Sequence, residues 1–230
     1  MRTVLTTKKL KESQRLLLLN AGISLVEYNA IKIESIPFEV PKNIENAIFT
    51  SQNAVNAVMG YELGVRSCFC VGKKTKQRLE ENGFSVIKMT EYAAELADYL
   101  VNNHKKNSFH FFCGNIRSDE IPSKLKESNI IFEEIEVYKT ILTPKKFERQ
   151  FDAVLFFSPS GVKSYCEVNR VDSSIHPFLQ GVAEGNRVGL KAICIGTTTA
   201  QEAKKYTENV VIANATTVES VIAKAVKILT

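Results

Sequence analysis

The sequence predicts an α/β protein with parallel sheets divided between two small domains. Short runs of β-branched and aromatic residues alternate with amphipathic helical patterns along the chain, as in strand–helix–strand units. Several of these runs are continuously apolar, which is typical of parallel strands buried on both faces. The strand candidates outnumber what one small sheet usually holds, so 230 residues suit two sheets better than one.

The strand candidates are short segments rich in β-branched and aromatic residues, bounded by turn-forming or charged residues. In chain order they are Thr3–Thr6, Leu25–Ile31, Ala47–Thr50, Cys68–Val71, Ser85–Ile87, Phe109–Cys113, Ile131–Thr140, Ala153–Phe157, Ala192–Ile195 and Val210–Ala213. Between most of them, apolar residues recur every three or four positions, which predicts helices. These patterns include Thr75–Asn82, Ala93–Asn102, Ile121–Ser128, Thr199–Tyr206 and Val218–Ile228.

An internal repeat organises these elements. Phe49–Val55 recurs as Phe156–Val162, 107 residues later, and Cys70–Thr75 recurs as Cys194–Thr199, 124 residues later. The difference of 17 residues predicts an insertion near Val171–Arg187 in the second copy. The chain is therefore a tandem duplication in which each copy supplies five strands.

Two architectures are compatible with the repeat. Proline-marked breaks follow the second strand of each copy, at Ile36–Pro41 and at Thr143–Pro144. Either each copy is one domain, or the copies exchange halves at these breaks. In the second case Met1–Ile33 joins Leu142–Thr230, and Phe38–Tyr138 forms an inserted domain. Both give five strands per domain, so the repeat alone leaves the choice open.

The composition excludes several classes of protein. There are 30 Lys and Arg against 25 Asp and Glu, and the net charge of +5 suits an anionic small molecule as well as nucleic acid. The longest aliphatic run, Leu16–Leu19, is much shorter than a membrane helix requires, and the first residues contain no apolar signal core. We therefore expect a cytoplasmic protein without a membrane segment.

The sequence offers little reactive machinery. The five cysteines form no CxxC motif and are expected to be reduced core thiols, and the three histidines are scattered, so no metal site is expected. The GxGxxG, P-loop and GxSxG patterns are missing, which argues against a nucleotide cofactor and a serine hydrolase.

Hydroxyl-rich turns follow three strand candidates and open helices, at Thr50–Asn53, Ser158–Gly161 and Gly196–Thr199. An open parallel sheet binds ligands beyond the carboxyl ends of its strands, and helix N-termini attract carboxylate or phosphate. For each turn alone, N-capping by Ser or Thr is the simpler explanation. Several such turns facing one cleft would instead favour a ligand.

Two further residues are candidates for function. Tyr138 lies at the second break, and its counterpart in the first copy is Ile31, so the duplicated fold alone does not require a phenol there. A buried core tyrosine is the alternative. Arg117 follows a strand candidate, where it would either meet an anion or form a salt bridge with an acid at the start of the next helix.

Six motifs occur in order along the whole chain: FTSQNAV at 49–55, CVGKKT at 70–75, GNIRSDEIPSKL at 114–125, VYKT at 137–140, FFSPSGV at 156–162 and IGTTTAQEAK at 195–204. Together they resemble the uroporphyrinogen-III synthase family. The resemblance implies two Rossmann-like (flavodoxin-like) α/β domains with parallel sheets, in which the halves of the repeat are exchanged. The implied domains are 1–33 with 142–230, and 38–138. A two-stranded β-ladder joins them, with 34–37 and 139–141 as hinge linkers.

The resemblance also implies an activity, that of a cofactor-free lyase. Such an enzyme cyclises hydroxymethylbilane to uroporphyrinogen III, with loss of water and inversion of ring D, in tetrapyrrole biosynthesis. By match to the motifs, Tyr138 and Thr199 would be catalytic, with Tyr138 helping the hydroxide depart. The residues expected to bind the substrate are Ser51, Thr90, Arg117, Ser158, Thr198 and Lys8.

The expected partner is this substrate, a linear tetrapyrrole with eight carboxylates. The protein is expected to be a monomer that makes transient contact with the preceding enzyme of the pathway, without nucleic acid or membrane partners. The competing interpretation is a non-catalytic two-domain binding protein for an anionic metabolite. A nucleic-acid module is a weaker third interpretation, because the net charge is modest and no aromatic and basic platform is present.

Overall fold

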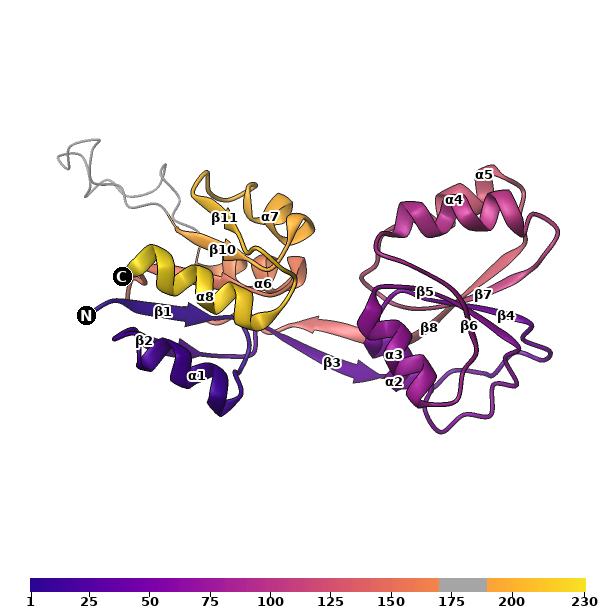
Figure 1. Ribbon diagram of the computed structural model, residues 1–230, viewed down its shortest axis with the longest axis horizontal. Helices are drawn as coiled ribbons and strands as arrows, with labels where there is room; N and C mark the ends of the chain where they lie inside the picture. The colour runs from indigo at the N-terminus through magenta and orange to yellow at the C-terminus, as the bar shows by residue number, and fades with distance from the viewer. Residues whose placement is uncertain (170–189) are drawn as a thin grey trace. The chain divides into compact units, whose positions relative to one another are not determined.

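The computed structural model describes residues 1–169 and 190–230 (Figure 1). The insertion expected near Val171–Arg187 lies outside the described residues. The chain divides into two compact units: unit 1 comprises Met1–Lys32 and Ile141–Thr230, and unit 2 comprises Ile33–Thr140. Each unit is an α/β structure with its own hydrophobic core.

Unit 1 contains a five-stranded sheet of order β11-β10-β9-β1-β2, in which every pair is parallel. Helices α6 and α7 pack over one face, above a core around Phe156, and helices α1 and α8 pack over the other, above a core around Leu155. The elements are β1 (Thr3–Thr6), α1 (Glu12–Leu19), β2 (Ser24–Glu27), β9 (Ala153–Phe156), α6 (Pro159–Val168), β10 (Ala192–Cys194), α7 (Thr197–Ala203), β11 (Val210–Ile212) and α8 (Val218–Leu229).

Unit 2 is organised around a six-stranded sheet of order β3-β8-β7-β4-β5-β6, and the pairs from β8 to β6 are parallel. Helices α2 and α3 cover a core around Phe49, and helices α4 and α5 cover a core around Ile48 on the other face. The elements are β3 (Ile31–Ser35), β4 (Asn46–Phe49), α2 (Gln52–Val58), β5 (Ser67–Val71), α3 (Lys73–Glu81), β6 (Val86–Thr90), α4 (Ala93–Asn103), β7 (Phe109–Gly114), α5 (Glu120–Glu127) and β8 (Phe132–Leu142). Strands β3 and β8 carry the chain between the units.

The strand order shows how the repeat is distributed. To the parallel parts of the sheets the first copy supplies β1, β2, β4, β5 and β6, and the second copy supplies β7 to β11. The first copy also contains β3, an eleventh strand that the repeat did not predict and that pairs with β8 at the edge of unit 2. Unit 1 combines the first two strands of the first copy with the last three of the second, and unit 2 combines the complementary strands. Counted within the repeat, both parallel sheets have the order 2-1-3-4-5, which is the flavodoxin-like order. The halves of the repeat are therefore exchanged.

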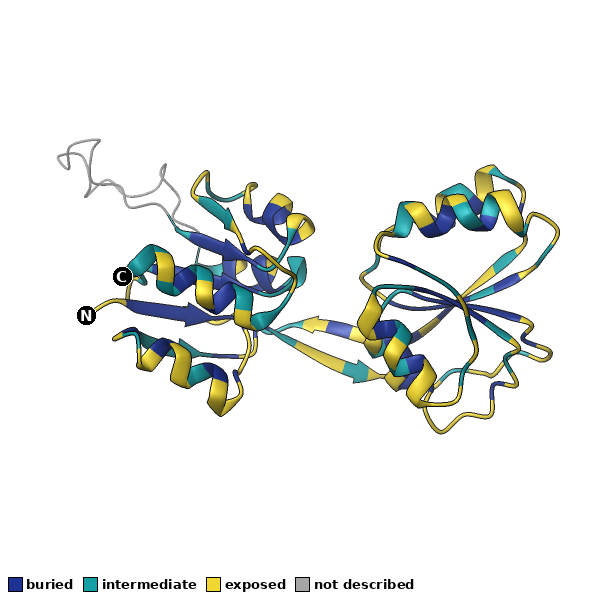
Figure 2. Ribbon diagram, in the orientation of Figure 1, coloured by how far each residue is buried: buried dark blue, intermediate teal, exposed yellow. Residues whose placement is uncertain are grey.

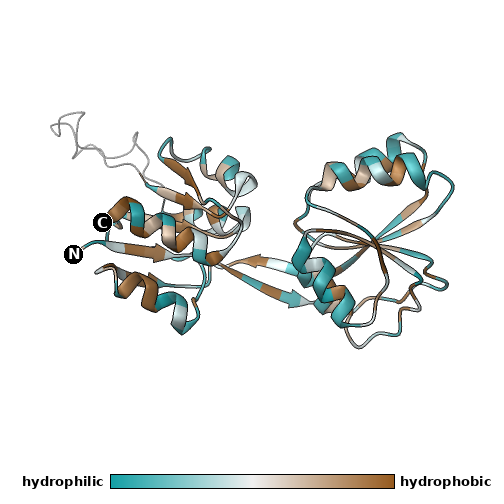
Figure 3. Ribbon diagram, in the orientation of Figure 1, coloured by the Kyte–Doolittle hydropathy of each residue, from teal (hydrophilic) through white to brown (hydrophobic). Residues whose placement is uncertain are grey.

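Three inner strands of the sheets, β1, β4 and β9, are buried at every position, as expected for parallel strands covered on both faces. Figure 2 shows β1 as buried, while Figure 3 shows hydrophobic residues along it. Residues that alternate along such a strand face opposite helix layers, so both faces need apolar side chains. The predicted α/β class with parallel sheets is confirmed.

The expected strand Leu25–Ile31 is wrong as one element, because it consists of the end of β2 and the start of β3. Tyr28 and Ala30 between them are buried in unit 1, and their N–H groups donate to the carbonyls of Thr6 (3.2 Å) and Thr7 (3.1 Å). Periodicity cannot reveal such a change of pairing partner. Helix α1 has no counterpart among the predicted patterns, because consecutive leucines carry no helical period.

All five cysteines are free and buried, as predicted. Desolvation raises the pKa of the Cys68 and Cys194 thiols to about 12 and of the Cys70 and Cys113 thiols to about 11. These four groups are therefore protonated at neutral pH and poor nucleophiles. Among the described residues, no helix is long and apolar enough to cross a membrane.

Candidate functional site

In each sheet there is one pair of neighbouring strands whose following connections run toward opposite edges of the sheet. This place, at the carboxyl ends of the two strands, is called the switch point. In unit 2 this switch point lies between β7 and β4, and in unit 1 it lies between β1 and β9. Open α/β sheets bind ligands at such points. Ser51 follows β4 and Asn115 follows β7, while Lys8 and Ser158 hold the corresponding places in unit 1.

The ring of Tyr138 lies against the end of β7 in unit 2. Tyr138 is on β8, is only 7% exposed, and belongs to the core around Phe49. Its ring packs on Gly114, where a Cβ atom would lie 2.4 Å from Tyr138 Cζ. A side chain at position 114 would therefore occupy the space of the ring, so glycine is what allows the phenol to reach this edge.

A β-bulge turns Tyr138 toward this face of the sheet. In the β7–β8 register Cys113 pairs with Glu136 and Gly114 pairs with Tyr138, which leaves Val137 as an extra residue. Strict alternation would place Tyr138 on the same face as Glu136, yet Val137 and Tyr138 are both buried in one core, and Glu136 is exposed. Bulges often redirect a side chain beside a functional site.

The hydroxyl of Ser51 joins the first turn of α2 to Tyr138. Ser51 is the N-cap of α2, and its Oγ accepts a hydrogen bond from the N–H of Ala54 at 3.1 Å. The same hydroxyl donates to Tyr138 Oη at 3.1 Å. Because the phenolic oxygen accepts this bond, the proton of Tyr138 is left for another acceptor. Two residues selected separately from the sequence are thus direct neighbours.

Ser51 and Ser158 form a matched pair of N-caps. Ser158 Oγ accepts from the N–H of Gly161 at 3.0 Å in the same way.

We expect Ser51→Ala and Ser158→Ala each to lower the free energy of unfolding by about 1 kcal/mol, with the larger loss at Ser51 because its bond to Tyr138 also disappears. Urea unfolding measures both, with Ser123→Ala, an exposed α5 position, as the control. An unchanged free energy at either cap would contradict this assignment.

The remaining candidates of unit 1 lie at the carboxyl edge of its sheet. Lys8 is exposed, with Nζ 5.8 Å from the centre of the Phe157 ring. The N-cap of α7 is Gly196, so Thr198 and Thr199 lie inside the first turn and are not capping residues. Thr198 is exposed and Thr199 is 3% exposed.

Thr90 and Arg117 in unit 2 are already engaged by the protein. Thr90 is buried, and its hydroxyl donates to the carbonyl of Tyr92 at 2.9 Å. Arg117 forms ion pairs with Asp119 and Glu134. Burial opposes ionisation of the guanidinium, but the bond to Asp119 and the charge of Glu134 raise its pKa overall. The salt-bridge alternative thus describes Arg117, and an anionic ligand would have to displace two carboxylates to reach it.

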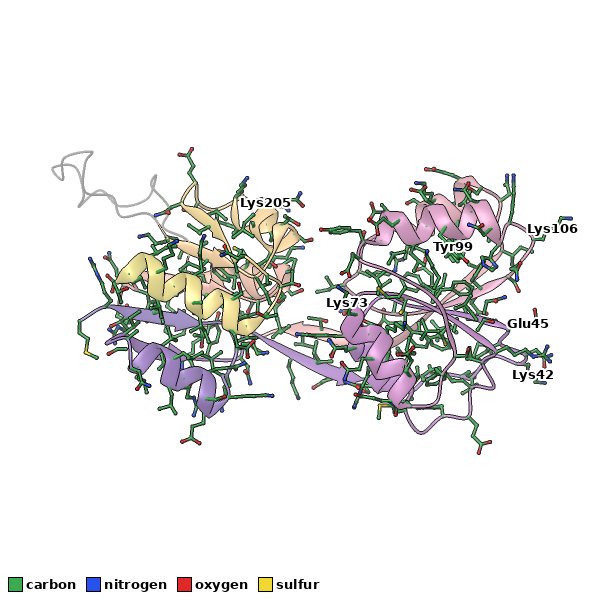
Figure 4. The ribbon with its side chains drawn as sticks, in the orientation of Figure 1. Lys42, Glu45, Lys73, Tyr99, Lys106 and Lys205 are labelled. Atoms are coloured by element: carbon green, nitrogen blue, oxygen red, sulfur yellow. The ribbon has the colours of Figure 1, made fainter. Side chains whose placement is uncertain are left out.

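Sequence reasoning did not select Gly114, Asn115 or Lys73. A glycine and an asparagine directly after a buried strand were the available signal for the first two, and both line a hollow of about 420 Å³ in unit 2. Lys73 begins α3 directly after β5 (Figure 4). Its ammonium lies 3.3 Å from Glu91, and both side chains are more than half exposed, so this pair is open to competition by an anion.

Comparison with known proteins identifies the same family by a family model and by a curated relative. Residues 12–223 match the family described as uroporphyrinogen-III synthase HemD. The porphyrin biosynthesis protein HemD of Ruminiclostridium josui is 24% identical over 231 residues, covering 90% of this chain. The chain spans 44% of the length of that curated relative.

Solved structures show the same fold. Uroporphyrinogen-III synthetase from Helicobacter pylori matches with a TM-score of 0.67 and 18% identity, covering 99% of this chain and 100% of the other. A mutant uroporphyrinogen III synthase from the extremely thermophilic bacterium Thermus thermophilus matches with a TM-score of 0.69 and 16% identity, covering 100% of this chain and 99% of the other.

Proposed function

The chain belongs to the uroporphyrinogen-III synthase HemD family, and on this premise we propose that it cyclises hydroxymethylbilane to uroporphyrinogen III. The observation that carries the proposal is the phenol of Tyr138 at the switch point of unit 2. Its ring is seated on Gly114, its oxygen accepts from Ser51, and its proton is available. The resemblance of the VYKT motif at 137–140 and this geometry both support Tyr138 as the catalytic group.

The proposed first step is departure of the hydroxyl group from the hydroxymethyl carbon of ring A. The carbon–oxygen bond breaks, and the lone pair of the ring A pyrrole nitrogen supplies the electrons that form a protonated azafulvene, an azafulvenium cation. Tyr138 Oη donates its proton to the leaving oxygen, which departs as water, and the proton released when the ring closes restores the phenol. General acid assistance of this kind contributes typically 10²–10⁴-fold.

The second task is to control which carbon of ring D attacks. In water the bilane closes at the free carbon of ring D and gives the type I isomer. The proposed enzyme directs attack from the substituted carbon, through a spiro-pyrrolenine that fragments and recombines. This is a task of orientation and water exclusion, for which hydroxyl and ammonium groups that hold carboxylates are sufficient.

We propose that hydroxyl and ammonium groups that follow the carboxyl ends of strands bind the carboxylates of the substrate. The exposed Lys8 and Thr198 and the half-buried Ser158 of unit 1 support this assignment, with Thr199 assisting the leaving group. In unit 2 the exposed Lys73 is an additional cation that the sequence did not single out, whereas Thr90 and Arg117 would first have to exchange their internal partners.

The proposed domains are residues 1–33 with 142–230, and residues 38–138, with hinge linkers at 34–37 and 139–141. The division of the chain after Lys32 and after Thr140 supports boundaries close to these. We propose that the protein acts in the cytoplasm as a monomer that receives the unstable bilane from the preceding enzyme.

The test is to supply hydroxymethylbilane and resolve the type III isomer from the spontaneous type I isomer by chromatography. We expect mostly type III product with the protein present and type I product without it. Product that is entirely type I would refute the synthase activity. If the protein nevertheless binds the tetrapyrrole, that result would support the competing interpretation of a non-catalytic binding protein.

A further inference from the structure

The end of strand β8 in unit 2 is hydrogen-bonded to a side chain where a regular sheet would use a main-chain carbonyl. In a regular parallel ladder, a bonded residue uses both of its main-chain groups. Its N–H donates to the carbonyl of one residue on the partner strand, and its own carbonyl accepts from the N–H of the residue two positions further along that strand. The N–H of Asn115 donates to the carbonyl of Tyr138 at 3.3 Å, so the regular partner for the N–H of Thr140 is the main-chain carbonyl of Asn115. The acceptor is instead Asn115 Oδ1, at 2.8 Å.

The side chain of Asn115 therefore continues the ladder after its own backbone has turned away. Strand β7 ends at Gly114, and Asn115 begins the loop toward α5. Its amide also donates from Nδ2 to the carbonyl of Thr140, at a longer 3.4 Å. A carboxamide offers one acceptor and two donors, so it can hold both main-chain groups of Thr140 at once.

These bonds bracket Tyr138. Asn115 bonds the carbonyl of Tyr138 through its backbone and Thr140 through its side chain, while Gly114 just before it supports the Tyr138 ring. Thr140 is the last residue of unit 2, and Asn115 bonds it on the β7 side, while β3 pairs with the other edge of β8. Loss of the carboxamide would remove both bonds from the Asn115 side chain to Thr140, and the segment of β8 that carries Tyr138 would be less firmly held against β7.

We propose that Asn115 is a positioning residue, which holds Tyr138 in place by clamping Thr140; this inference rests on the proposed function. We expect Asn115→Ala to lower the rate of type III formation about tenfold, since small displacements of a catalytic group are costly. Asn115→Asp retains the acceptor of the shorter bond and should be clearly less impaired than Asn115→Ala. Asn103→Ala is the matched control, because Asn103 Nδ2 also donates to a main-chain carbonyl, that of Tyr99, within α4.

A double-mutant cycle separates positioning from general stability. If Asn115 acts through Tyr138, Asn115→Ala should change the rate less than about twofold when Tyr138 is already Phe. Equal losses in both backgrounds, or Asn115→Asp as impaired as Asn115→Ala, would overturn the proposal.

A second measurement does not depend on catalysis. With ¹³C-labelled tyrosine, the ring signal of Tyr138 is assigned by its loss in Tyr138→Phe, and it should shift in Asn115→Ala but not in Asn103→Ala. An unshifted signal would refute the positioning role. If the wild-type protein gives only type I product while this signal still shifts, the proposed function fails and the clamp on Tyr138 stands.

Discussion

Tyr138→Phe should lower the rate of uroporphyrinogen III formation by about 10²-fold, the lower end of what general acid catalysis contributes. The change removes one oxygen atom and leaves the ring seated on Gly114, so the fold has no reason to rearrange. Only the bond from Ser51 is lost, and the half-buried hydroxyl of Ser51 still accepts from Ala54. The rate is measured as type III isomer formed above the spontaneous type I background.

The matched control is Tyr99→Phe. Tyr99 lies on α4 of the same unit, away from the switch point (Figure 4). Its ring faces the ammonium of Lys88, with Nζ 4.7 Å from the ring centre. That contact is made by the ring and survives loss of the hydroxyl, so we expect an unchanged rate. A folded Tyr138→Phe protein with wild-type turnover would remove Tyr138 from the mechanism, and equal losses in both variants would point to a non-specific effect.

Gly114→Ala adds a single methyl group, and we expect it to reduce both the stability and the activity of the protein strongly. The added Cβ would lie 2.4 to 2.9 Å from three atoms of the Tyr138 ring, closer than carbon atoms approach. Because the ring is rigid and both residues sit on paired strands, the ring must be displaced. We expect the free energy of unfolding to fall by about 1–3 kcal/mol, as in other overpacked cores, and the rate of type III formation to fall about 10²-fold.

Two further variants test the cause of this loss. Gly196→Ala adds a methyl group that meets its nearest neighbour, Thr216 Cγ2, at 3.4 Å, so its free energy of unfolding should fall less than that of Gly114→Ala, by the cost of alanine at the N-cap of α7. In a Tyr138→Ala background the obstacle is gone, and Gly114→Ala should then cost little further stability. If Gly114→Ala costs the same with and without the tyrosine ring, the collision is not its cause.

Local patterns were sufficient for most of the fold. The sequence places β1 at its observed bounds, and the repeat correctly equates β4 with β9 and β5 with β10. Apolar runs and turn residues act through neighbouring positions, so they can be recognised without knowledge of the partner strand. The exchange of halves was different, because it concerns which segments pair. The repeat was compatible with both arrangements, and only the family resemblance favoured the one observed.

The candidate site was predictable as a set of residues but not as an arrangement. The sequence selected Ser51 and Tyr138, yet nothing in it indicated that the two are hydrogen-bonded. For Arg117 it offered a salt bridge with an acid at the start of the next helix as an alternative, but not the second pair with Glu134. Asn115 was overlooked because an exposed asparagine after a strand is ordinary in sequence, and its importance arises from the Thr140 backbone 25 residues away.

The sequence by itself determined the α/β class, the duplication, the positions of most elements and the motifs of the family. Tertiary structure alone decided which way Tyr138 faces. Side chains alternate along a regular strand, and one extra residue, Val137, opposite the Gly114 end of β7 reverses that alternation. The register of two strands depends on contacts distant in sequence, so the seat of the phenol on Gly114 exists only once β7 and β8 have paired.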